Sequence, residues 1–62
     1  MKLQEVIERV EHIRAVCGDD EAAHSLEDSL HQDVLRHHAE RGCPLAIEAL
    51  KTLDIDFERW TA

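Results

Sequence analysis

The chain has 62 residues and carries a net charge of −7, from 14 acidic and 7 basic residues. A chain of this length forms one small domain that buries only about 60% of its unfolded surface, so we expect no deep cofactor pocket and no enzymatic activity. An acidic chain repels phosphate backbones and anionic lipid, so we also expect no direct binding to nucleic acid or to a membrane surface.

The first predicted element is a helix over about residues 2–17. Ile7 and Val16 widen its apolar stripe, and Gly18 follows it. We expect Gly18 to adopt the left-handed backbone that commonly ends a helix. The spacing of the stripe is typical of a seam between helices, so this helix is the expected contact of a homodimer. The stripe itself consists of Leu3, Val6, Val10, Ile13 and Cys17.

A second helix is predicted over about residues 20–40. Asp19 or Asp20 can cap its N-terminus, and Gly42 follows its C-terminus. Apolar residues at helical spacing indicate the side that faces the core. They are Ala23, Leu26, Leu30 and Val34, followed by His37 or His38.

The third helix is predicted over about residues 44–53, with Pro44 in its first turn. Asp56 can cap a short helical turn over residues 56–60. No segment alternates polar and apolar residues in the way that a strand does. The sequence therefore predicts an all-α fold in one domain, residues 1–62, as a three-helix bundle or as a helical hairpin plus a third helix, with a short C-terminal helical turn.

The cysteines and the N-terminal region bear on the compartment. Cys17 and Cys43 are predicted at opposite ends of a helix about 30 Å long. A disulfide requires alpha carbons within about 7 Å, so we expect two free thiols. Charged residues such as Glu5 and Glu8 interrupt any apolar run of a secretory signal. We therefore expect an intracellular, cytoplasmic protein.

Four of the five histidines lie on the second predicted helix. His24, Asp28 and His31 are spaced by four and three, so one helix face can present two imidazoles and a carboxylate to zinc or nickel. The spacing matches no named metal signature, and a solvated helix flank is the more ordinary interpretation; a pH-responsive surface is another. We expect no cofactor, and a histidine-rich metal-binding protein is kept as the second alternative function.

Acidic residues are concentrated in the same helix. Residues 19–40 carry 7 acids and one base, whereas residues 1–18 carry 3 of each. Such an acidic face can bind a protein partner. The alternative is a DNA mimic, whose carboxylates imitate phosphates and compete for a nucleic-acid-binding protein. The candidate partner-binding acids are Asp20, Glu27, Asp28 and Asp33.

The aromatic residues Phe57 and Trp60 form a second candidate surface near the C-terminus. Being three residues apart, they point the same way in a helical turn. They can seal a thin core, or one of them can stay exposed and anchor a partner, because tryptophan is enriched among interface hot spots. Both residues are therefore candidate partner-binding residues.

Two segments resemble small uncharacterised phage and prophage proteins: DEAAHSLED at residues 20–28 and LKTLDIDFERW at residues 50–60, about a third of the chain. His37, His38 and Cys43 depart from that pattern. No activity is attached to the group, so no site residue carries over. The resemblance implies a short acidic phage protein that binds and blocks a host protein. The leading expectation is therefore a small intracellular protein-interaction module of this kind, with a host protein as its partner.

Overall fold

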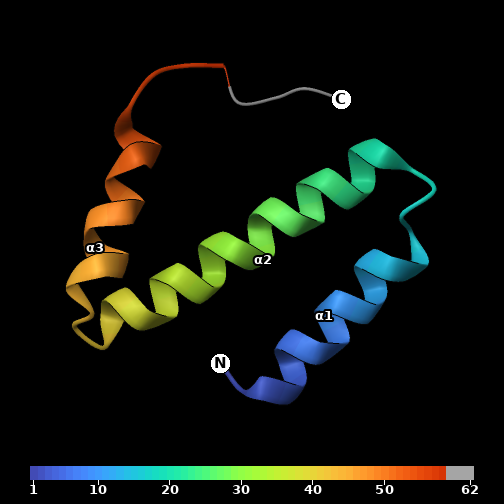
Figure 1. Cartoon of the computed structure of the whole chain (residues 1–62), viewed down its shortest axis with the longest axis horizontal. Coiled ribbons are helices and arrows are strands. Elements are labelled where there is room, and N and C mark those ends of the chain that lie inside the picture. Colours follow the sequence, from blue (N-terminus) through green and yellow to red (C-terminus); the bar gives the residue numbers. More distant parts are fainter. Residues whose placement is uncertain (59–62) are drawn as a thin grey trace.

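The computed structural model describes residues 1–58 as three helices and a short C-terminal helical turn (Figure 1). Helix α1 spans Leu3–Ala15, α2 spans Asp20–Glu40, α3 spans Pro44–Leu50, and the 3₁₀ helix η1 spans Lys51–Asp54. No strand occurs within residues 1–58, which confirms the predicted all-α class. No helix in that range combines the length and the apolar content needed to cross a membrane.

The ends of α2 follow from local sequence and agree with the predicted range. Asp19 caps the N-terminus, where its Oδ1 accepts a hydrogen bond of 3.1 Å from the backbone N–H of Ala22. Beyond the C-terminus, Gly42 has a φ of +89°, in the left-handed region that favours glycine. Pro44 then begins α3.

The end of α1 differs from the prediction. The helix stops at Ala15, because the backbone N–H of Val16 is shared between two carbonyls of the last turn. Gly18 does not have the predicted left-handed backbone, so that prediction was wrong. The turn is closed instead by a hydrogen bond of 2.9 Å from the N–H of Asp19 to the carbonyl of Val16. Cys17, the last residue of the predicted stripe, is exposed.

The C-terminal segment also differs from the prediction. The predicted third helix, residues 44–53, is α-helical only as far as Leu50 and then tightens into η1. The helical turn expected at residues 56–60 is wrong for residues 56–58, which are not helical. A single turn there has too few residues to repay helix nucleation. Residues 59 and 60 lie outside the described part of the chain.

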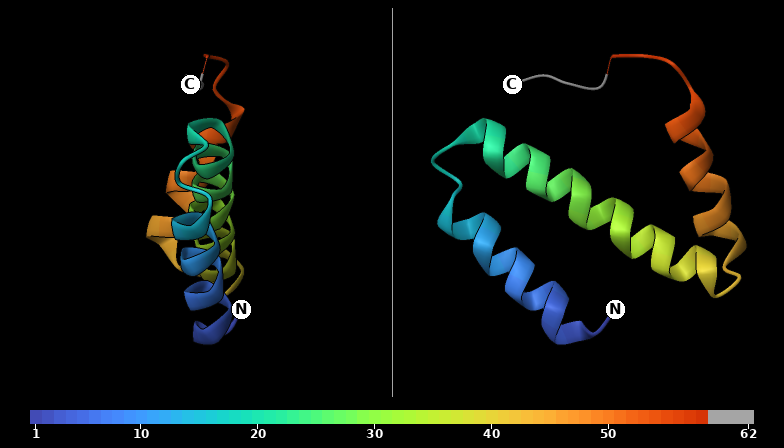
Figure 2. Two further views of the ribbon diagram at one scale, coloured as in Figure 1. Left: turned by 90° about the vertical axis from the view of Figure 1, so that its right-hand side faces the viewer. Right: turned by 180° about the vertical axis from the view of Figure 1, so that it is seen from behind.

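The helices form one flat layer with α2 in the middle (Figures 1 and 2). The chain measures 35 × 32 × 10 Å along its principal axes, and the shortest of these is about the diameter of one helix. α1 and α3 lie on opposite sides of α2, and each contacts α2 but not the other. The chain is therefore a helical hairpin with a third helix on its far side, the more open of the two predicted arrangements.

A single layer buries little. Within residues 1–58 only Leu30 on α2 and Ala46 on α3 are buried, with 5% and 4% of their surface exposed. Domains ordinarily enclose a core between two layers, and this chain supplies only one. Large apolar side chains therefore remain exposed at residue 1, on α1, on α3 and in the C-terminal segment. They are Met1, Leu3, Ile7, Val10, Leu45, Ile47, Leu53, Ile55 and Phe57.

Candidate functional site

A groove with a volume of about 400 Å³ opens between α2 and the arm made of α3, η1 and residues 55–58. We call it the α2–α3 groove. In Figure 1, α3 leaves the C-terminal end of α2 at an angle, and the chain after η1 turns back toward the N-terminal half of α2. The groove is lined by His24, Asp28, Gln32, Leu35, Ala49, Leu50, Thr52, Leu53, Phe57 and Glu58.

The wall formed by α2 is one stripe of the helix. Its four lining residues recur at intervals of four and three, which places them on the side of α2 that faces α3. The turn at Gly42 and Pro44 directs α3 back along this stripe. Because α3 has only 7 residues and α2 has 21, α3 covers part of the stripe and leaves the rest open.

The groove combines apolar walls with negative charge. Leu35, Leu50 and Leu53 supply apolar surface, and Phe57 is 52% exposed beside them. The carboxylate of Asp28 lies 3.4 Å from the imidazole Nε2 of His24 and is itself half exposed. Glu58 adds a second carboxylate, and no lysine or arginine belongs to the described lining. Such a surface suits an apolar group that carries a positive charge beside it.

Two predicted partner-binding residues meet in this groove. Asp28 comes from the acidic helix and Phe57 from the aromatic C-terminal segment, and the two were expected to belong to separate surfaces. The fold brings them to opposite walls of one groove. Trp60, the other aromatic candidate, lies outside the described residues.

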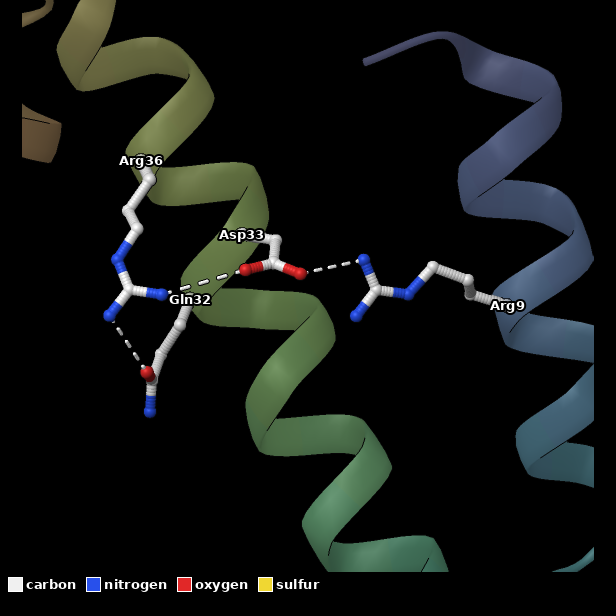
Figure 3. Close-up of polar contacts among 4 residues, drawn as sticks. All are labelled: Arg9, Gln32, Asp33 and Arg36. Carbon is white, nitrogen blue, oxygen red and sulfur yellow. Dashed lines mark hydrogen bonds and ion pairs between the residues drawn. The ribbon is translucent and has the colours of Figure 1, made fainter.

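Asp33 lies on the other side of α2, toward α1 (Figure 3). Its Oδ2 accepts a hydrogen bond of 2.9 Å from Nη1 of Arg9, and its Oδ1 lies 3.5 Å from Nη1 of Arg36. Nη2 of Arg36 in turn donates to Oε1 of Gln32 at 3.4 Å. Asp33 is thus engaged in holding α1 to α2.

The predicted acidic residues do not form one row. Asp28 faces the groove and Asp33 faces α1, while Asp20 and Glu27 are exposed residues outside the groove lining. A DNA mimic needs carboxylates along one continuous face. The division between sides of α2 does not favour that alternative.

The candidate metal ligands are only partly brought together. His24 and Asp28 form a pair in the groove, but His31 is an exposed residue of α2 outside it. Among residues 1–58, no group of three histidine, cysteine, aspartate or glutamate side chains is arranged to hold a metal ion. The geometry therefore does not favour the metal-binding alternative.

Several groove residues were not predicted as site residues. Leu50 and Leu53 line the groove and are apolar residues three apart in the third predicted helix, and such residues are ordinarily assigned to a core. The sequence held one signal for the groove, which is the short length of the segment from Pro44 to Asp54. So short an arm cannot cover a helix of 21 residues.

No family model matches the chain, and comparisons with curated proteins and with solved structures likewise found no match. The likeness to phage proteins therefore stays a prediction from the two sequence segments that suggest it. The candidate site is defined by the geometry and charge of the α2–α3 groove.

Proposed function

We propose that the chain is a small protein-interaction module that binds a segment of another protein in the α2–α3 groove. The observation that carries this proposal is the combination of apolar walls with the carboxylates of Asp28 and Glu58, on a chain of net charge −7. The module acts by binding this segment of its partner and covering it. The proposal assigns it no catalytic step and no cofactor.

The chemistry of the groove specifies the partner segment. Leu35, Leu50 and Leu53 suit side chains such as leucine or phenylalanine, and the two carboxylates attract lysine or arginine at the rim. A volume of about 400 Å³ lies near the small end of the range for ligand pockets. The groove therefore takes a few side chains of an apolar, basic segment and not a whole helix.

The biological role follows from the resemblance to small acidic phage proteins. In that role the chain is a phage-encoded inhibitor, and its partner is a host protein whose apolar, basic segment it covers. The proposed compartment is the cytoplasm. Cys17 and Cys43 support this, because both are free thiols, as expected in a reducing compartment.

Selection of a random peptide library against the immobilised chain tests the proposal. We expect enrichment of peptides in which large apolar residues are flanked by lysine or arginine. Titration of one selected peptide, followed by amide chemical shifts, should move resonances of groove residues such as Leu50 and Leu53 and leave those of α1 unchanged. Enrichment of acidic or purely polar peptides would contradict the proposed chemistry.

A matched pair of charge reversals locates the binding site. Asp28→Lys removes a groove carboxylate, and Glu40→Lys makes the same change in charge on an exposed residue of α2 outside the groove lining. We expect Asp28→Lys to weaken binding of the selected peptide at least about tenfold, as charge truncations at interfaces do. Glu40→Lys should change it much less, and equal losses in the two variants would mean that only net charge matters.

A further inference from the structure

Helix α1 carries a row of exposed apolar side chains that α2 does not cover. Leu3, Ile7 and Val10 are 75%, 43% and 39% exposed, and their spacing of four and three aligns them along the helix. We call this row the α1 stripe. At 3.6 residues per turn it lies about a third of a turn from the side that Arg9 directs toward Asp33. The α1 stripe therefore points away from α2, toward the outer side of the layer.

The chain exposes more surface than a compact monomer of its mass. Its accessible surface is 4930 Å², whereas the scaling law for folded monomers gives about 4,100 Å² at 7.1 kDa. This excess is spread over the whole chain, and it is comparable with the roughly 800 Å² that each partner contributes to a protein–protein interface of standard size. A second copy packed along the α1 stripe would cover part of the apolar surface that the flat layer leaves exposed.

The absence of net charge on residues 1–18 allows a second copy of the chain to pack against the α1 stripe. Residues 1–18 hold 3 bases and 3 acids, so two copies of α1 meet without net repulsion. Residues 19–40 hold 7 acids and one base, so a dimer formed through α2 would bring two strongly acidic segments together. A symmetric dimer uses the same patch on both copies, which makes the neutral patch the favourable one.

We infer that a second copy of this chain packs on the α1 stripe, forming a two-fold dimer in which the two α1 helices run antiparallel. Arg14 continues the row four residues after Val10. Parallel helices would place the two Arg14 side chains next to each other, whereas antiparallel helices separate them and align the helix dipoles favourably. The dimer leaves the α2–α3 groove open, because α1 and α3 lie on opposite sides of α2.

Sedimentation equilibrium measures the oligomeric state directly. We expect the wild-type chain to have twice its chain mass of 7.1 kDa. Ile7→Lys buries a charge in the contact from each copy and should raise the dimer dissociation constant at least about a hundredfold. The control Leu45→Lys changes an apolar side chain on α3 that is 82% exposed, and it should leave the constant within about twofold.

A monomeric wild-type chain at millimolar concentration would overturn the inference. A dimer that Leu45→Lys weakens as much as Ile7→Lys would also overturn it, because the contact would then lie elsewhere. If Ile7→Lys does not fold, the milder Ile7→Ala replaces it, with an expected tenfold or greater weakening. Retained peptide binding in a monomeric Ile7 variant separates this inference from the proposed function.

The orientation is tested with the native cysteines. A chain with Cys43→Ser keeps only Cys17, near the C-terminal end of α1, and a chain with Cys17→Ser keeps only Cys43. Antiparallel α1 helices hold the two copies of Cys17 far apart. We therefore expect the first chain to form disulfide-linked dimers no faster than the second in a glutathione redox buffer. Markedly faster linkage through Cys17 would overturn the antiparallel arrangement.

Discussion

Arg9 and Asp33 join α1 to α2 through an ion pair of 2.9 Å, with side chains that are 28% and 42% exposed (Figure 3). We expect a double-mutant cycle of Arg9→Ala and Asp33→Ala, followed by urea denaturation, to give a coupling energy of about 0.5–1 kcal/mol. The control pair Glu11 and Arg14 lies at 3.4 Å within α1 and is more than half exposed, so its coupling should be close to zero. Equal coupling in the two pairs would mean that Arg9 and Asp33 do not hold the helices together.

We expect alanine to affect the free energy of unfolding differently at the two glycine positions of the chain. Gly42 has a φ of +89°, where an L-residue is strained, so Gly42→Ala should lower the free energy of unfolding by about 1 kcal/mol. Gly18 has no positive φ, and Gly18→Ala should be neutral or stabilising by up to about 1 kcal/mol. A methyl group meets no atom within 4 Å at either position, so the difference reports the backbone alone. Thermal denaturation of the two variants measures it.

The thin core predicts that stability depends heavily on Leu30. This side chain is 5% exposed, whereas Leu45 is 82% exposed. Leu30→Ala should lower the free energy of unfolding by about 2 kcal/mol or more, and Leu45→Ala should change it by less than about 0.5 kcal/mol. Chemical denaturation at one fixed protein concentration compares them. Similar losses in both variants would show that Leu30 is not the centre of packing.

We expect the stability of the folded chain to depend on pH through His37. Partial burial lowers the pKa of His37 below its usual value of 6.5, and the positively charged N-terminal amino group, Arg41 and His38 lower it further, against a smaller opposing effect of Glu40. The nitrogen of that amino group lies 3.4 Å from Nδ1 of His37. The unfolded chain therefore binds the proton at higher pH than the folded chain does.

The contribution of His37 to stability is consequently full above pH 6.5 and is lost as the pH falls below that value toward the lowered pKa. Urea midpoints measured between about pH 8 and about pH 5.5 should fall with pH, and His37→Gln should make that fall smaller. An unchanged slope in His37→Gln would assign the pH dependence to other groups.

The ends of the helices were predictable because their causes lie within a few residues. Asp19 caps α2, while Gly42 and Pro44 separate it from α3, and each acts through its own backbone or side chain. Gly18 shows where this reasoning fails. Glycine ends α2 through a left-handed backbone at Gly42, whereas Gly18 lies within an ordinary turn closed by the hydrogen bond from Asp19 to Val16. The difference depends on hydrogen bonds that the residue type does not specify.

The faces of the helices were less predictable than their ends. The apolar residues of α1 cover more of the helix than one neighbouring helix can bury, so the pattern could not distinguish the partly buried Ile13 from the exposed Ile7. The groove was hidden for a related reason. Asp28 and Phe57 lie far apart in the sequence, and only the angle between α2 and α3 brings them to the same groove.

The central place of α2 has a consequence for local unfolding. Within residues 1–58, α2 is the only α-helix that contacts α1 or α3, so these two outer helices can open separately, as terminal units of a repeat array do. Opening of α3 destroys one wall of the α2–α3 groove, whereas opening of α1 leaves both walls in place. We therefore expect a ligand bound in the groove to slow hydrogen exchange of amides in α3 and to leave that of α1 unchanged, whereas the proposed dimer contact should slow exchange in α1.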